Sequence, residues 1–382
     1  MYTQLNWGFW CAVKVQATAI FGSRPEAVPE SSGKFSPTYI EDVAPRLSHS
    51  SDTSPIEIRG ITKKQFQTYL LLITGLPYNN DYLPLLVDYL TPEKHTQDLF
   101  LRYLDIATVA PRLGMAKLEE WAMNALHIVF TESANSFRRV PYDWKYGILL
   151  QLRGLTRETN LDLPVQAFIQ YLIHKIVHDI RHNQGASGCS SKIADLIEIY
   201  QGFKKLDDDA LLGCVFLNIL SLGHRSQVWS DLTRDDKAIL YAAQAQLTNL
   251  PQEFAPGSLA WVTKPDPVAQ QLCDACQLRL SGVWDKIFRE CNEGLGSNIP
   301  LKDVLFLAEM PEYRWALWSE MSQVAPTVCT LSPLVPPSSP ATSSTSRPIT
   351  CPIRSLLNDV DQYIQDVYEQ AASRYRAIAR EF

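Results

Sequence analysis

The sequence predicts an α+β protein that is predominantly α-helical, with a small mixed domain followed by a larger all-helical one. One short stretch, Pro55–Gly60, alternates apolar and charged residues as a half-buried strand does. From Tyr142 to Gln323, apolar residues recur at helical spacing with few interruptions. The chain has 382 residues, which exceeds the usual size of one hydrophobic core, so two domains are expected.

The predicted organisation has five parts. A variable N-terminal segment (1–34) precedes the mixed domain (35–131), and the helical domain occupies 132–325. Residues 326–352 are dominated by Pro, Ser and Thr, which predicts a linker that cannot bury enough surface to order itself. Residues 353–382 are expected to form an amphipathic helix beyond it.

Composition and charge argue against several classes of protein. Hydrophobic residues make up 46% and charged residues 20%, which is typical of a packed globular chain. The net charge is −6 and no basic block stands out, so direct nucleic-acid binding is not expected. The longest apolar stretch, Ala210–Leu222, contains Asn218 and is shorter than the roughly 20 residues that a bilayer needs. We therefore expect a buried core helix there, no membrane segment, and a location in the cytoplasm or the nucleus.

The mixed domain is expected to contain a helix and a helical hairpin after its strand. Thr62 can cap a helix over Lys64–Thr74, and Leu85–Leu90 forms one apolar turn within the loop that follows. Two further helices, Asp98–Val109 and Ala116–Phe130, are separated by a glycine-containing corner, which predicts the hairpin.

Residues 54–130 resemble the second half of a BTB/POZ domain, as found in many fungal proteins. The strand, the helix after it and the helix pair follow the family's order. The positions that match the pattern of the helix pair are Leu104, Ala107, Met115, Leu118, Trp121, Ala122 and Leu126. Upstream, the histidine that opens the family's first helix has no counterpart, so the N-terminal half of the domain is divergent or incomplete.

This resemblance implies a non-enzymatic protein-interaction module that forms homo- or hetero-oligomers. In the family, such modules act in transcriptional regulation or present substrates to a cullin-type ubiquitin-ligase scaffold, and the sequence does not choose between these roles. The expected partner is another protein or a second copy of the chain. The residues expected in the core or at the interaction surface are Leu104, Ala107, Met115, Leu118, Trp121 and Leu126 of the hairpin, with Leu357 and Ile364 of the C-terminal helix.

The cysteines support an alternative interpretation, in which the chain is a metal-stabilised regulatory protein. Cys273 and Cys276 form a Cys-x2-Cys half-site, with Cys291 nearby in sequence, and zinc needs four ligands. The pair lies within a helical pattern and has no second half-site. We therefore favour buried thiols without metal, and we expect no cofactor.

Three histidines in one helix are the other potential metal ligands. His174, His178 and His182 are spaced four residues apart, so neighbours could share an ion. The outer two lie roughly 12 Å apart along the helix axis, so all three cannot bind one ion. A solvated helix face is favoured for all three.

The sequence also lacks the motifs of common enzymes. It contains no nucleophile elbow and no phosphate-binding glycine loop. The carboxylates of Asp207–Asp209 are more simply explained as the N-terminus of a helix. We therefore expect that the chain is not an enzyme.

Two further predictions concern the end of the helical domain and the C-terminal helix. Leu301–Ala308 and Glu312–Gln323 are expected as separate helices on either side of Pro311. In the C-terminal helix, an apolar seam is formed by Ile353, Leu357, Val360, Ile364, Val367, Ala371 and Ile378. Asp361 is placed on its polar side. Arg374 interrupts the seam, which favours docking on the chain's own domain or on a partner over a long coiled coil.

Overall fold

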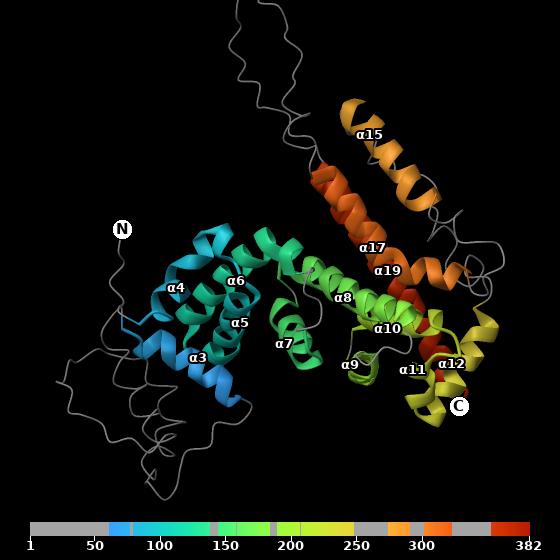
Figure 1. The fold of residues 1–382 in the computed structure, drawn as a ribbon, viewed down its shortest axis with the longest axis horizontal. Helices are drawn as coiled ribbons and strands as arrows, with labels where there is room; N and C mark the ends of the chain where they lie inside the picture. Colours follow the sequence, from blue (N-terminus) through green and yellow to red (C-terminus); the bar gives the residue numbers. More distant parts are fainter. Residues whose placement is uncertain are drawn as a thin grey trace, which may run out of the picture. The chain divides into compact units, whose positions relative to one another are not determined.

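The computed structural model describes residues 61–76, 79–137, 144–157, 159–183, 189–206, 208–247, 274–290, 302–322 and 353–382. Within these ranges the regular structure is helical and no strand occurs, which confirms the prediction of a predominantly helical protein (Figure 1). The predicted strand Pro55–Gly60 and the segment 1–34 lie outside the described residues. None of the described helices is long and apolar enough to cross a bilayer. The chain divides into two compact units, Met1–Val140 and Pro141–Phe382.

The first unit consists of helices and short 3-10 turns. Its elements are α3 (Lys63–Thr74), α4 (Tyr82–Val87), η1 (Asp88–Leu90), η2 (Pro92–Lys94), α5 (Gln97–Arg112) and α6 (Ala116–Phe137). A capping box begins α3, since the Gln65 amide donates to the Thr62 hydroxyl and the Thr62 amide donates to the Gln65 side chain. Gly114, at φ 71°, makes the corner between α5 and α6. These two helices pack together, and α3 packs on α5.

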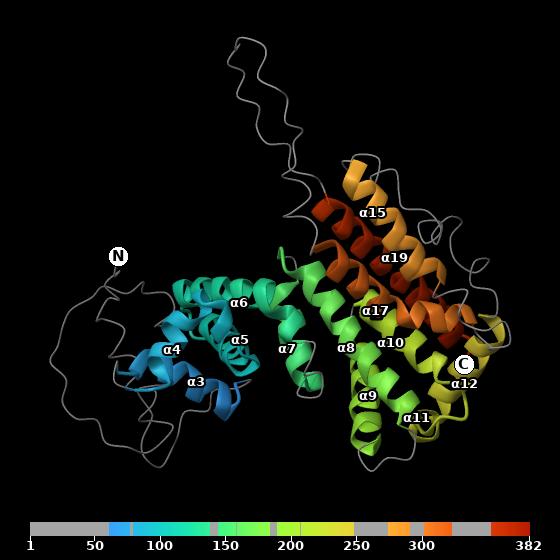
Figure 2. The ribbon, with the colours of Figure 1, turned by 45° about the horizontal axis from the view of Figure 1, so that its top comes forward.

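The second unit surrounds one buried helix. Its elements are α7 (Tyr146–Thr156), α8 (Asp162–His182), α9 (Cys189–Phe203), α10 (Asp209–Ser221), α11 (Gln227–Asp231), α12 (Arg234–Gln246), α15 (Asp274–Trp284), the π-helical turn η5 (Asp285–Glu290), α17 (Lys302–Ser322) and α19 (Ile353–Ala379). Every residue from Ala210 to Leu220 is buried, as expected for a helix that is apolar all round. Helices α8, α9, α12, α17 and α19 all contact α10 (Figure 2).

Helix α17 corrects the prediction of two helices separated by Pro311. It runs unbroken through that proline. A proline has no amide hydrogen, so the carbonyl of Leu307, four residues earlier, loses its helical donor. The Tyr368 hydroxyl of α19 donates to this carbonyl at 2.9 Å, and His174 of α8 contacts the next one, at Ala308. Partners from distant parts of the chain therefore stabilise a helix that local sequence would break.

Helix α19 docks along α10 within its own unit, and it also contacts α8, α12 and α17. Asp361, which the sequence pattern placed on the polar side, is only 2% exposed and forms an ion pair with Arg314 of α17. Gln365 is buried as well and accepts a hydrogen bond from Gln170 at 2.6 Å. The error arose because the partners of these polar groups come from other helices, which periodicity cannot reveal.

Candidate functional site

Three exposed apolar side chains on α4 and η1 form the candidate interaction surface of the first unit, here named the α4 face. Leu83, Val87 and Leu90 are 51%, 42% and 64% exposed. Their spacing of four and three residues places them on one side of the helical turns. Leu85 lies on the opposite side and is fully buried, so α4 presents one apolar side to the core and another to solvent.

The backbone beneath the α4 face is held by hydrogen bonds from the core. The Tyr103 hydroxyl of α5 donates to the Leu85 carbonyl at 2.9 Å. His95 binds the Tyr89 carbonyl through Nε2 at 3.0 Å and the Ser133 hydroxyl through Nδ1 at 2.8 Å. A carbonyl can only accept, so Nε2 carries the proton and Ser133 donates to Nδ1. Helix α4 is thereby tied to α5, and η1 is tied to α6 through His95.

Aromatic packing and ion pairs complete the surroundings of this surface. The Tyr89 ring lies edge-on to both Tyr103 and Trp121, with ring centroids 6.1 Å apart in each case. Near the start of α4, Arg102 bonds Asp98 at 2.8 Å and lies 3.7 Å from Asp81. An apolar centre with charged neighbours is the arrangement that protein interfaces use.

The residues singled out from the sequence are buried or half-buried wherever the structure describes their side chains. Leu104, Ala107 and Leu126 are buried in the core of the first unit. Met115 and Leu118 are half-buried against a core cluster of Phe66, Tyr69, Ile73 and Val109. Trp121 is half-buried against Tyr89 and Tyr103. In the second unit, Ile364 is buried, whereas the side chain of Leu357 lies outside the described residues. These positions build the scaffold, and the exposed apolar side chains come from α4 and η1.

Sequence reasoning missed Leu83, Val87 and Leu90 as a surface. It expected one apolar turn over Leu85–Leu90 but assigned it no role. A signal was present, because apolar residues occur on every side of the short segment Tyr82–Leu90, and a six-residue helix cannot bury all of them.

The cysteine cluster is only partly within the described structure. Cys276 is buried on α15, whereas Cys273 and Cys291 lie outside the described residues. Among the residues that the structure describes, no group of three or more His, Cys, Asp or Glu side chains is placed to hold a metal ion.

His174 corrects the prediction that the three histidines share a solvated face. It is buried against α17, and its Nδ1 donates to the Ala308 carbonyl at 3.1 Å. Burial lowers the pKa of His174 to about 3, so the ring is neutral. His178 is half-buried and His182 is exposed, so only the last part of the face meets solvent.

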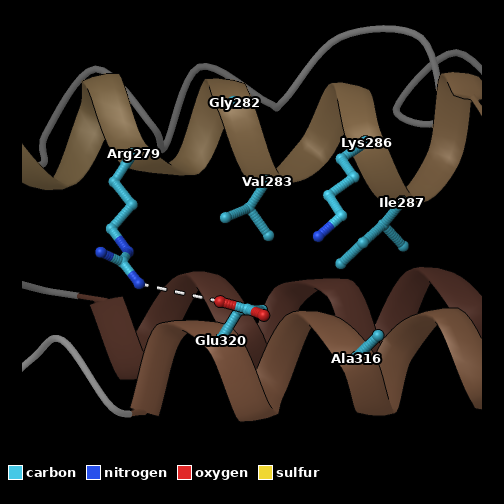
Figure 3. A pocket seen from close by; sticks show the side chains of 7 residues that line it. All are labelled: Arg279, Gly282, Val283, Lys286, Ile287, Ala316 and Glu320. Carbon is cyan, nitrogen blue, oxygen red and sulfur yellow. Dashed lines mark ion pairs between the residues drawn. The ribbon is translucent and has the colours of Figure 1, made fainter.

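A groove of about 400 Å³ separates α15 and η5 from α17 (Figure 3). Arg279 and Glu320 form an ion pair across it at 3.7 Å, and Lys286 points into it from η5. Gly282, Val283, Ile287 and Ala316 supply the apolar part of its lining. The groove thus combines an ion pair and a lysine with an apolar lining, and this mixture does not indicate one class of ligand.

Comparisons with protein-family models, with curated proteins and with solved structures found no match to this chain.

Proposed function

We propose that this chain is a non-enzymatic protein-interaction module that binds a protein partner through the α4 face. The observation that carries the proposal is the exposure of Leu83, Val87 and Leu90 on a turn anchored by the core. Fully burying one aliphatic side chain contributes roughly 1.5–3 kcal/mol, so covering these partly exposed residues would supply several kcal/mol to association. The anchored backbone means that little additional ordering is required on binding.

The resemblance of residues 54–130 to BTB/POZ domains supports homo- or hetero-oligomerisation as the form of this binding. In that reading the module serves a transcriptional regulator or a substrate adaptor of a cullin-type ubiquitin ligase. The partner would present a complementary apolar surface with charged groups at its edge, opposite Asp81 and Arg102.

The test places a photo-crosslinking residue at position 90 of the full chain and identifies what is captured. Leu278, on α15, is the matched control position because it is 80% exposed but lies in the second unit. We expect one specific partner, or a second copy, to crosslink from position 90 and not from 278. Comparable capture from both positions, or from neither, would contradict the proposal.

A substitution then measures the contribution of the α4 face. Leu90→Asp places a charge where a partner would bury an apolar side chain, and position 90 is exposed enough to accept it without loss of fold. We expect affinity for the identified partner to fall by about a hundredfold, which corresponds to about 2.7 kcal/mol. Leu278→Asp, with the same chemical change, should leave the affinity unchanged. An equal affinity for Leu90→Asp would exclude this surface.

A further inference from the structure

His178 and His182 form a stacked pair near the end of α8. Their ring centroids are 4.1 Å apart and their planes differ by 29°. Residues four apart lie on the same side of a helix, so both rings point from α8 in the same direction. His182 is exposed and His178 is half-buried, so the pair is open to solvent.

The hydrogen bonds of the pair assign the protons on the rings. Nδ1 of His182 lies 2.8 Å from the His178 carbonyl, which can only accept, so Nδ1 carries the proton and Nε2 keeps its lone pair. Nδ1 of His178 is buried and has no hydrogen-bond partner within the described residues. Asp179 Oδ1 lies 3.7 Å from this atom, and its negative charge favours the proton at Nδ1 and a lone pair at Nε2. Metal-binding imidazoles commonly direct their other ring nitrogen at a carbonyl or carboxylate, as His182 does here.

Two cationic side chains near the pair are themselves held in ion pairs. Arg181 bonds Glu309 of α17 at 3.0 Å, and Lys192 of α9 bonds Asp179 at 2.8 Å. These pairs offset the positive charge that would otherwise oppose a cation.

His174 cannot join the pair as a third ligand. Its Nδ1 is committed to Ala308, and its Nε2 lies 3.8 Å from Glu312 Oε2, on the side of the helix that α17 covers. A site at the end of α8 therefore has two protein ligands.

We propose that His178 and His182 chelate a borderline divalent transition-metal ion through their Nε2 atoms. Imidazole suits Zn²⁺, Cu²⁺ and Ni²⁺, whereas Mg²⁺ and Ca²⁺ prefer oxygen ligands. Two nitrogens bound tetrahedrally to zinc at ~2.05 Å lie about 3.3 Å apart, so both side chains must rotate out of the stacked arrangement for their in-plane Nε2 lone pairs to meet at one ion. The remaining coordination positions are open to water or to a group from outside the chain.

The test is a calorimetric titration of the full chain with Zn²⁺. His182→Gln removes one ligand at an exposed position, so the fold should be retained, and a melting curve of the variant verifies this. His224→Gln is the matched control because His224 is also exposed and lies outside α8. We expect wild type and His224→Gln to bind zinc equally and His182→Gln to bind about tenfold more weakly or worse. Zinc held by thiols elsewhere would be common to all three proteins.

A second readout is thermal stability. An ion that binds only the folded chain raises the melting temperature, and the rise grows with the ratio of the ion concentration to its Kd. Zn²⁺ should therefore raise the melting temperature of wild type and of His224→Gln, Mg²⁺ should not, and a chelator should reverse the effect. The proposal is overturned if His182→Gln binds zinc as tightly as wild type, or if no His182-dependent zinc binding occurs up to millimolar concentrations.

Discussion

The Tyr368 hydroxyl of α19 donates a hydrogen bond to the carbonyl that Pro311 leaves without a helical donor in α17. The acceptor is Leu307, and the donor–acceptor distance is 2.9 Å. Since Tyr368 is fully buried, no solvent can replace this bond. A single side chain from the C-terminal helix thus compensates for a proline inside another helix.

This relationship predicts a dependence between two substitutions. Tyr368→Phe should lower the free energy of unfolding by about 1–3 kcal/mol, because it leaves a buried carbonyl unsatisfied. In a Pro311→Ala background the new amide can bond Leu307, so the same Tyr368→Phe change should have a much smaller effect. Denaturant unfolding of the four proteins in this double-mutant cycle measures the coupling. Equal effects in both backgrounds would show that the hydroxyl does not compensate for the proline.

The close approach of α19 to Gly213 of α10 leads to a second prediction, which concerns the free energy of unfolding. A Cβ at this position would lie 1.8 Å from the Tyr368 carbonyl oxygen, and backbone atoms of α19 cannot easily move away. Gly213→Ala should therefore lower the free energy of unfolding by about 3 kcal/mol, near the upper end for overpacking. Gly154→Ala on α7 is the matched control, because the added methyl group would meet no atom within 4 Å beyond its own helix backbone and chain neighbours. It should stabilise the protein by about 0.5–1 kcal/mol. Chemical unfolding should give opposite signs for the two changes.

The buried ion pair between Arg314 and Asp361 predicts a large penalty for removing one partner. Arg314 is 5% exposed, and its Nη2 lies 2.6 Å from Asp361 Oδ2. Asp361→Ala should cost about 3–5 kcal/mol, since it leaves a buried charge unpaired. Replacing both residues by leucine should cost less than this single change.

An exposed pair supplies the control for that prediction. Arg102 and Asp98 are joined at a similar distance, 2.8 Å, but the side chain of Asp98 is 64% exposed and that of Arg102 is 28% exposed. Asp98→Ala should cost less than about 1 kcal/mol. Similar values for Asp98→Ala and Asp361→Ala would contradict the role of burial.

Part of this fold was accessible from the sequence alone. The run Ala210–Leu222 predicted a buried helix because it is apolar on every side, and α10 is that helix. The unbroken course of α17 could not be predicted, because it depends on Tyr368, which lies 61 residues from its acceptor. The burial of Asp361 depends likewise on Arg314 of another helix. For the candidate surface, the sequence indicated the apolar turn, but which of its leucines face the core was decided by packing on the rest of the first unit.

The hydrogen bonds of Asp236 lead to a prediction about how the stability of the second unit changes at low pH. This buried carboxylate accepts hydrogen bonds from Lys204 at 2.5 Å, Thr233 at 2.6 Å and Gln201 at 2.7 Å. Burial alone would raise the pKa of Asp236, but these bonds outweigh burial and lower it below its usual value. The unfolded chain therefore takes up this proton at higher pH than the folded chain does. The resulting stability is fully present above the unfolded pKa and is lost as pH falls through the folded pKa.

Urea unfolding between pH 7 and pH 2 tests this expectation. Wild type should lose more stability on acidification than Asp236→Asn, and the two proteins should converge at low pH. Asp231→Asn, which removes an exposed carboxylate from the neighbouring turn, serves as the control. Parallel curves for wild type and Asp236→Asn would mean that the hydrogen bonds to Asp236 do not depend on its charge.

The burial of α10 on all sides has a consequence during synthesis, because α10 is made well before α19, one of the helices that cover it. About 130 residues separate the end of α10 at Ser221 from the start of α19 at Ile353. At roughly 5–20 residues per second, α19 emerges on the order of 10 s after the helix that it covers. Throughout that interval one side of α10 lacks its partner. The nascent chain must therefore carry an uncovered side of α10, which includes Phe216, as a binding site for chaperones until α19 has been made.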